Sequence, residues 1–263
     1  MIVDNFSQFL PIARDCADAA RACIKPYFRA NITIDTKQDN SPVTMADRKA
    51  EQAMREIIMR KYPSHSILGE EEGQEGHLSG EWLWILDPID GTRSFVTGRP
   101  SFCTLISLFH KGKPVLGLVD QPITEERWIG IEGEKTQFMS PNITGSAGTR
   151  QCNTISRAEL SCTSPEIISQ ENKSRFEKLQ NSVKRTSWGG DAYAYGLLSL
   201  GHIDLIAEDT LKPWDWAALV PVIKGAGGTI TDWNGHALTL ESKGNVLACG
   251  SPNLLGEAVK ALS

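Results

Sequence analysis

Residues 82–92 of the chain read WLWILDPIDGT, and this stretch decides which fold we expect. Its first five residues are all apolar, which predicts a strand that is covered on both faces by other elements. Asp87 and Asp90 follow, with a proline between them that restricts the backbone angle φ. We therefore expect a tight turn in which both carboxylates and the carbonyl of Ile89 face one point.

The stretch ends in Gly91 and Thr92, which we expect to open a helix. Because Gly91 has no side chain, a ligand can approach its backbone closely. The free N–H groups at the start of a helix can also receive phosphate oxygens. An Asp-Gly pair after a strand is equally common in turns that bind nothing. The chemistry of this turn therefore depends on what other segments bring to it.

Other acidic residues stand in comparable places along the chain. Glu70 follows a short predicted strand at 66–69, and Asp215 opens an apolar segment. In sheets covered by helices, ligands gather at the carboxyl ends of strands, so these two side chains are expected to meet Asp87 and Asp90. Carboxylates held this close take up protons unless a cation neutralises them. Hard oxygen ligands of this kind suit Mg²⁺, so the sequence predicts a magnesium site.

Each acidic residue also has a simpler explanation. Asp215 can be a favourable charge near the start of a helix. Asp47 can be the third position of a capping box that begins at Thr44. The acidic run at 70–72 can be a solvated loop. Only their joint occurrence favours a site over these readings.

The chain reads as two α/β halves. Residues 4–28 and 41–63 have the apolar spacing of helices, strand-like segments fill most of 82–133, and strands and helices alternate later in the chain. A segment rich in Gly, Ser and Asn at 140–153 separates the halves. This mixture predicts sheets with helices on more than one face. The expected halves are 1–145, which holds most of the acidic motifs, and 146–263, which completes the site with Asp215.

The composition limits the partners. The 263 residues carry a formal net charge of −5, which argues against nonspecific binding to nucleic acid or to an anionic membrane surface. The six cysteines form no C-x-x-C pair and are interpreted as small buried hydrophobic residues. Because no signal peptide or long apolar run is recognised, we expect a cytoplasmic protein that does not enter a membrane.

Four segments together resemble the motifs of one family. They are SPVTMAD at 41–47, GEE at 69–71, LDPIDGT at 86–92 and WDWAAL…GAGG at 214–228. In this order and spacing they resemble the inositol-monophosphatase superfamily of metal-dependent phosphomonoesterases. The resemblance implies an α/β fold, an αβαβα sandwich with helices between and outside two sheets. It also implies a homodimer.

The resemblance implies a role for each acidic residue. Two or three Mg²⁺ ions would be held by Glu70, Asp87, the Ile89 carbonyl, Asp90 and Asp215. Glu70 and Thr92 would position and deprotonate a metal-bound water, with Asp47 hydrogen-bonded to Thr92. The backbone of Asp90, Gly91 and Thr92 would grip the phosphate.

The segments 117–130 and 188–228 look more like the histidinol-phosphate phosphatase branch of this superfamily than like its inositol-specific members. Asp191 stands where inositol-specific relatives typically carry a small residue. Glu208 lies seven residues before Asp215, where the superfamily places a substrate-facing acid. Two carboxylates make charge-assisted hydrogen bonds to an ammonium group such as that of histidinol. A polyol offers only neutral donors, whose weaker hydrogen bonds offset less of the cost of desolvating the carboxylates. The implied substrate contacts are Glu70, Ile89, Asp90, Gly91, Thr92, Asp191, Glu208 and Asp215.

Two features of this region allow other readings. Asp191 can instead cap the helix that follows it, and the two roles are compatible. Relatives in this branch often place arginine just before the aromatic-Gly-Gly-Asp run, but here Ser187 holds that position and Arg185 lies two residues earlier.

We therefore predict a Mg²⁺-dependent phosphomonoesterase that hydrolyses L-histidinol phosphate to L-histidinol and phosphate in histidine biosynthesis. The alternative is an inositol-1-monophosphatase or a broad sugar-phosphate phosphatase of the same fold. A third reading is a catalytically inactive relative that binds metal or a partner. The presence of every acid that the implied mechanism needs argues against this third reading.

Overall fold

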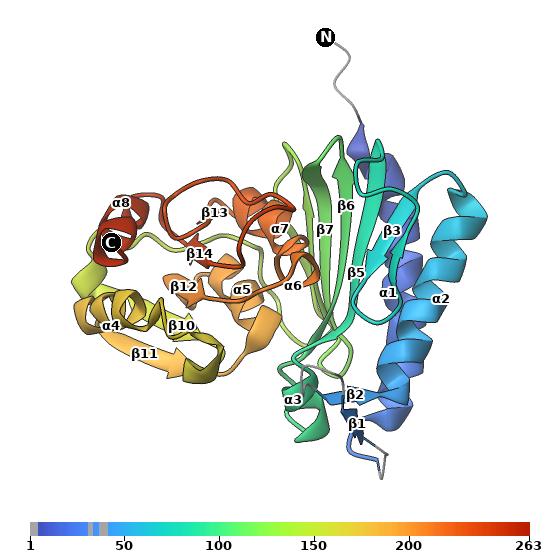
Figure 1. Cartoon of the computed structure of the whole chain (residues 1–263), viewed down its shortest axis with the longest axis horizontal. Coiled ribbons are helices and arrows are strands. Elements are labelled where there is room, and N and C mark those ends of the chain that lie inside the picture. The colour runs from blue at the N-terminus through green and yellow to red at the C-terminus, as the bar shows by residue number, and fades with distance from the viewer. Residues whose placement is uncertain (1–4, 31–33, 37–41) are drawn as a thin grey trace.

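The structure is a computed structural model that describes residues 5–30, 34–36 and 42–263, without the side chains of 34–36 and 42–44. The predicted cap by the side chain of Thr44 therefore lies outside the described residues. Strands β1 (Ile34–Thr36) and β2 (Pro42–Thr44) pair antiparallel in a small ribbon below the larger sheets (Figure 1).

A seven-stranded sheet forms most of the first half of the chain, in the order β4-β3-β5-β6-β7-β8-β9. Neighbouring strands are antiparallel except for the parallel pair β3 and β5. The strands are β3 (Ser66–Gly69), β4 (Gly73–Glu75), β5 (Trp82–Asp90), β6 (Cys103–His110), β7 (Lys113–Gln121), β8 (Glu126–Ile131) and β9 (Gln137–Met139). Helices α1 (Leu10–Ile24) and α2 (Met45–Lys61) cover one face of this sheet (Figure 1).

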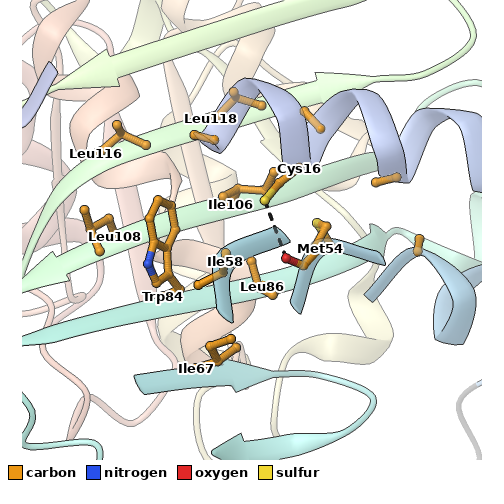
Figure 2. Close-up of a cluster of buried hydrophobic side chains, with 14 of the residues drawn as sticks. Cys16, Met54, Ile58, Ile67, Trp84, Leu86, Ile106, Leu108, Leu116 and Leu118 are labelled. Atoms are coloured by element: carbon orange, nitrogen blue, oxygen red, sulfur yellow. Dashed lines mark hydrogen bonds between the residues drawn. The ribbon is translucent and has the colours of Figure 1, made fainter. Parts of the chain in front are cut away.

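Apolar side chains fill the space between these two helices and the sheet, as Figure 2 shows. Met54 and Ile58 of α2 meet Trp84 and Leu86 of β5 there, all fully buried. Burying a large apolar side chain contributes roughly 1.5–3 kcal/mol, so this layer accounts for much of the stability of the first half. Cys16 lies in the same core, where burial raises the pKa of its thiol. The prediction of buried cysteines is confirmed for five of the six, and the remaining one is half-buried.

The second sheet has five strands in the order β11-β10-β12-β14-β13. They are β10 (Glu159–Cys162), β11 (Arg185–Trp188), β12 (Leu205–Glu208), β13 (Thr229–Thr231) and β14 (Val246–Cys249). Helices α4 (Lys173–Ser182) and α8 (Leu254–Ala261) cover its outer face. Phe176 of α4 and Leu254 of α8 share a buried cluster with Leu160, Leu205 and Leu247 of the sheet.

Three helices lie between the two sheets: α5 (Asp191–Ser199), α6 (Pro213–Trp216) and α7 (Leu219–Gly225) (Figure 1). Helix α7 approaches the backbone of β7 and β8 closely because glycines face it. A Cβ atom on Gly117 would lie 1.9 Å from the Ala218 carbonyl oxygen, and one on Gly130 would lie 2.3 Å from the Pro221 backbone. The order of layers is helices, sheet, helices, sheet, helices, so the predicted αβαβα sandwich is confirmed.

The predicted boundary between 145 and 146 falls in the connection between the two sheets, after β9 ends at Met139 and before β10 begins at Glu159. The middle layer of helices packs against both sheets in one buried cluster, so the halves share a core. The division into two domains stays a prediction.

Short helices complete the fold. They are the α-helix α3 (Thr92–Val96) and the 3-10 helices η1 (Phe6–Phe9), η2 (Lys25–Tyr27), η3 (Ile155–Arg157) and η4 (Pro165–Ile167). The apolar segment that Asp215 opens contains two helices, α6 and α7. Within the described residues, each helix is too short or too polar to pass through a membrane.

Candidate active site

Strand β5 runs through both aspartates of the opening stretch, which corrects the expected tight turn. Asp87 pairs with Leu105 of β6 and Asp90 with Cys103, so a β-bulge places one extra residue on β5 between the aspartates. In a regular strand, residues three positions apart lie on opposite faces. The extra residue reverses this alternation, so both carboxylates can face the same point. Proline has no N–H to donate to a sheet, and a bulge tolerates it because one residue there is left unpaired.

Asp215 joins these two aspartates from the middle layer of helices. Carboxylate oxygens of Asp87, Asp90 and Asp215 lie within 4.8 Å of one another. The Oδ2 atom of Asp215 also accepts a hydrogen bond of 2.6 Å from the backbone N–H of Lys212, at the start of α6. Asp215 therefore caps its own helix and contributes to the acidic cluster at the same time.

Burial, with the neighbouring negative charges added to it, raises the pKa of all three carboxyl groups. For Asp87 the first cause is burial, and the charges of Glu70, Asp90 and Asp215 add to it. Burial and then the charge of Asp191 raise the pKa of Asp90 well above its ordinary value. Burial raises the pKa of Asp215 to about 7. A cluster of this kind repels itself unless protons or a cation neutralise it.

Glu70 follows β3 directly and lies beside the cluster. Its backbone N–H donates a 3.2 Å hydrogen bond to the carbonyl of Leu86, the residue before Asp87. Its charge raises the pKa of both Asp87 and Asp215, which places its carboxylate near both. The structure thus brings together the four acids that the sequence assigns to one place.

This donor set fits Mg²⁺. Within the described ranges, Asp87, Asp90 and Asp215 form the single group of three or more side chains placed to hold a metal ion, and it contains no His or Cys. Hard carboxylate oxygens are the ligands that Mg²⁺ prefers, usually a few of them completed by water. A divalent cation would also remove the repulsion that raises the pKa of these groups.

The Ile89 carbonyl and the Thr92 hydroxyl are in contact in the turn after the bulge. Oγ1 of Thr92 donates to the Ile89 oxygen over 3.0 Å, and the Ile89 N–H donates to Oδ1 of Asp87 over 3.0 Å. The carbonyl keeps a second lone pair for another partner. Asp47 is fully buried in the first turn of α2, and its hydrogen bond to Thr92 stays a prediction.

Asp191 lies against α3 and does not cap α5. No side-chain capping hydrogen bond forms at this helix, whose N-cap residue is Gly190. Instead, Oδ2 of Asp191 accepts a 2.8 Å hydrogen bond from Oγ of Ser94, and the N–H of Ala192 donates to Oδ2 of Asp90 over 2.6 Å. The alternative reading of Asp191 as a helix cap is therefore wrong.

Gly91 has to be glycine for two reasons. Its φ of 83° lies in the left-handed region, where other residues are strained. A Cβ atom at this position would also lie 2.6 Å from Oδ2 of Asp191. The absence of a side chain therefore lets Asp191 of the second half touch the turn that follows β5.

Glu208 ends β12 and is buried at the side of the cleft. The hydroxyl of Tyr195 donates to Oε2 over 2.9 Å, and the N–H of Thr163 donates to Oε1 over 2.9 Å. Burial raises the pKa of Glu208, and these two donors act in the opposite direction. The sequence reasoning missed Tyr195 and Thr163, although a tyrosine one helical turn after Asp191 is a visible signal.

A cleft of about 460 Å³ opens above the cluster, between the two halves of the chain. Its lining includes Asp90, Thr92, Asp191, Glu208 and Asp215. Sequence reasoning also missed Arg93 and Arg99 in this lining. Their positive charges lower the pKa of Asp191, against the larger effect of burial.

Two arginines form ion pairs with glutamates, one between the two halves and one within the second half. Arg93 forms an exposed 2.7 Å ion pair with Glu166 of the facing half. Arg185, which departs from the pattern of the histidinol-phosphate phosphatase branch, pairs with Glu159 over 2.6 Å.

The layered fold and the carboxylate cluster define an α/β protein with a candidate site for a divalent cation. Residues 5–263 match the sequence model of the inositol monophosphatase family, and the chain belongs to that family. Members of this family are metal-dependent phosphatases that typically use Mg²⁺.

Three similar proteins show which phosphatases this chain resembles. The chain is 46% identical to the chloroplastic bifunctional phosphatase IMPL2 of Arabidopsis thaliana, over 98% of this chain and 76% of that protein. It is 36% identical to a histidinol-phosphatase of Mycobacterium tuberculosis, over 87% and 88% of the two chains. A solved inositol monophosphatase from Zymomonas mobilis shares 44% identity and a TM-score of 0.88, over 99% of each chain.

Proposed function

We propose that this protein is a Mg²⁺-dependent phosphomonoesterase that hydrolyses L-histidinol phosphate to L-histidinol and phosphate. One observation carries the choice of substrate: Asp191 and Glu208 line the same cleft as Asp90 and Asp215. An ester whose phosphate sits at the acidic cluster would meet these two further carboxylates with its alcohol part. The identity to a mycobacterial histidinol-phosphatase supports the same substrate.

The reaction forms a bond from a water oxygen to phosphorus and breaks the bond from phosphorus to the alcohol oxygen. When bound, Mg²⁺ neutralises charge on the phosphate and lowers the pKa of water. We assign its binding to Glu70, Asp87, the Ile89 carbonyl, Asp90 and Asp215. The convergence of the Asp87, Asp90 and Asp215 carboxylates supports this assignment. Positioning and charge supply most of the catalysis that phosphoryl transfer needs.

Other groups of this chain handle the water and the phosphate. In our proposal Thr92 holds the water through a lone pair of Oγ1, because its single proton is donated elsewhere. The acceptor is the Ile89 carbonyl in this structure, and it is the Asp47 carboxylate when the predicted hydrogen bond to that residue forms. Glu70 takes up the proton of that water, and Asp47 supports Thr92 from α2. Backbone N–H groups from Asp90 to Thr92 bind phosphate oxygens, and the departing alcohol oxygen takes up a proton.

Asp191 and Glu208, which we call the substrate wall, both receive hydrogen bonds that favour their charged forms. Ser94 donates to Asp191, and Tyr195 and Thr163 donate to Glu208. An ammonium group placed between two such carboxylates forms charge-assisted hydrogen bonds, which are about twice as strong as neutral ones. A polyol offers only neutral hydroxyl groups, so the same wall favours histidinol.

The test is phosphate release from L-histidinol phosphate, inositol-1-phosphate and an aryl phosphate, each with and without Mg²⁺. We expect the highest kcat/KM for histidinol phosphate. A preference for inositol-1-phosphate would reject the substrate and keep the phosphatase. If no ester releases phosphate in the presence of Mg²⁺, an inactive metal-binding relative becomes the better description.

An inositol-phosphate or broad sugar-phosphate phosphatase is the second candidate. The 44% identity to the inositol monophosphatase of Zymomonas mobilis supports it. Under this candidate the loss of the Asp191 charge would affect all esters alike.

The homodimer, the place in histidine biosynthesis and the cytoplasmic location belong to this proposal too. The Arabidopsis relative is named chloroplastic, so location needs its own test. Light scattering of the purified protein tests the dimer, and growth of a histidine-requiring strain that carries this gene tests the pathway.

A further inference from the structure

A buried glutamate outside the predicted site holds the loop that carries Glu70. Glu51 lies on α2 and is fully buried. Its Oε2 accepts the backbone N–H of Glu71 over 2.8 Å, and its Oε1 accepts that of Glu72 over 3.1 Å. The two peptide groups that follow Glu70 are therefore tied to one carboxylate.

Arg55, one helical turn further along α2, bonds both to Glu51 and to the same loop. Its Nε donates to Oε1 of Glu51 over 2.9 Å, and its Nη2 donates to the carbonyl of Gly73 over 2.6 Å. Arg55 is itself only 6% exposed. A buried carboxylate is costly unless it is paired and fully hydrogen-bonded, and here both conditions are met.

The end of β3 leaves space for the side chains of Glu51 and Arg55. A Cβ atom on Gly69 would lie 2.0 Å from Oε1 of Glu51 and 2.7 Å from Nη2 of Arg55. The φ of Gly69 is not in the left-handed region, so the requirement for glycine there is one of space. The Glu51 carboxylate thus sits against the residue that precedes Glu70.

Glu70 is consequently held from both sides. Its own N–H is bonded to the carbonyl of Leu86 on β5, and the next two N–H groups are bonded to Glu51 of α2. Strand β5 carries Asp87 immediately after Leu86. The loop is thereby fixed relative to the metal-ligand strand on one side and to a rigid helix on the other.

We propose that Glu51, supported by Arg55, is a positioning residue that sets the place of the Glu70 carboxylate. This inference rests on the proposed role of Glu70 at the metal and at the water. Reacting groups need placement within about 0.5 Å, and a displacement of about 1 Å can cost on the order of 100-fold in rate. Residues that orient a metal ligand typically change metal affinity or activity by about 10- to 100-fold when they are replaced.

The experiment compares Glu51→Gln with the wild-type protein. The amide keeps the shape, but its NH₂ group must replace one of the two oxygens. At Oε2 it would face the N–H of Glu71, and at Oε1 it would face both the N–H of Glu72 and Arg55, donor against donor in either case. We expect kcat for the best ester to fall about 10-fold or more, with KM within about twofold. Calorimetric titration of the substrate-free protein with Mg²⁺ should show an affinity about 10-fold weaker.

Glu56→Gln is the matched control, because Glu56 is on the same helix but exposed, where it accepts a 3.2 Å hydrogen bond from Gln52. A Glu51→Gln protein that matches this control in both kcat and Mg²⁺ affinity overturns the inference. A merely structural role lowers the melting temperature but leaves both values unchanged at a temperature where the protein is folded.

Three further outcomes have a defined interpretation. If Glu51→Gln does not fold, Glu51→Asp replaces it, because the shorter side chain keeps the charge for Arg55 and withdraws from the loop. The same criteria then apply. If the wild-type protein binds Mg²⁺ but hydrolyses no ester, the proposed function fails, while the Mg²⁺ titration still decides the positioning role. If the wild-type protein binds no Mg²⁺, both fail.

Discussion

The carboxylate of Asp90 accepts a 2.6 Å hydrogen bond from the backbone N–H of Ala192. Asp90 ends β5 in the first half of the chain, and Ala192 lies in the first turn of α5 in the second. A carboxylate near the start of a helix is stabilised by the helix dipole and by the free N–H groups. One oxygen of Asp90 thus fastens the two halves together, and the acidic cluster is built across that junction.

Replacing Asp90 by asparagine separates these two roles. The amide oxygen can still accept from Ala192, while one charge leaves a crowded cluster. Without metal we therefore expect Asp90→Asn to unfold at a higher temperature, with a gain of about 1 kcal/mol. With saturating Mg²⁺ the order should reverse, because only the wild-type protein binds the ion tightly. Scanning calorimetry with EDTA and with Mg²⁺ measures both, and a lower melting temperature in EDTA would contradict the expectation.

The titration of Asp215 predicts how metal-free stability depends on pH. The pKa of this carboxyl is about 7 in the fold against an ordinary value of 3.8, chiefly because of burial. A group whose pKa is raised on folding contributes stability below its unfolded pKa, and the contribution is lost as pH rises through the folded value. In EDTA the wild-type protein should therefore lose stability relative to Asp215→Asn between pH 4 and pH 8. Denaturant unfolding at several pH values measures the difference, and parallel curves would refute it.

The substrate wall predicts a selective effect at Asp191. This residue has a φ of 46°, which asparagine tolerates better than alanine does, so Asp191→Asn is the cleaner change. Loss of its charge should lower kcat/KM for histidinol phosphate by roughly 10- to 100-fold, the range for a hydrogen bond to a charged group. Turnover of an aryl phosphate, which has no ammonium group, should change less than about threefold. Equal losses on both esters would favour the broad phosphatase.

His65 predicts a second pH effect, distant from the cleft. Its Nδ1 accepts a 3.1 Å hydrogen bond from Nε1 of Trp84, and burial lowers its pKa, with Glu81 acting in the opposite direction. A lowered folded pKa means that stability is present above the unfolded value of about 6.5 and is lost as pH falls. The melting temperature of the wild-type protein should therefore fall more between pH 7 and pH 5 than that of His65→Phe.

The stability of His65→Phe at pH 7 is the control for this comparison. At pH 7 His65→Phe should be less stable than the wild-type protein by about 1–2 kcal/mol, because the buried Trp84 N–H loses its acceptor. Similar slopes of melting temperature against pH in the two proteins would show that His65 does not titrate in this range.

Short-range features of the chain predicted much of the fold. The apolar run of β5, the helical spacing in α2 and the alternation in the second half come from local patterns, so they could be recognised without coordinates. The acids also could be recognised, because each lies near the end of a strand or in the first turn of a helix. Where the prediction was wrong, as at the tight turn expected after Leu86, pairing with β6 extended the strand and inserted a bulge.

The tertiary structure alone decided which distant groups meet. Nothing local in the sequence indicates that the Asp191 carboxylate reaches Ser94, or that Glu51 lies under the loop of Glu70. Both contacts join residues from different elements, and their partners depend on how layers pack rather than on spacing along one element. The sequence by itself determined the residue types of the site, since local patterns set where strands end. Packing determined their contacts, because a hydrogen bond or a cluster of charges exists only between groups that the whole fold brings within a few ångströms of each other.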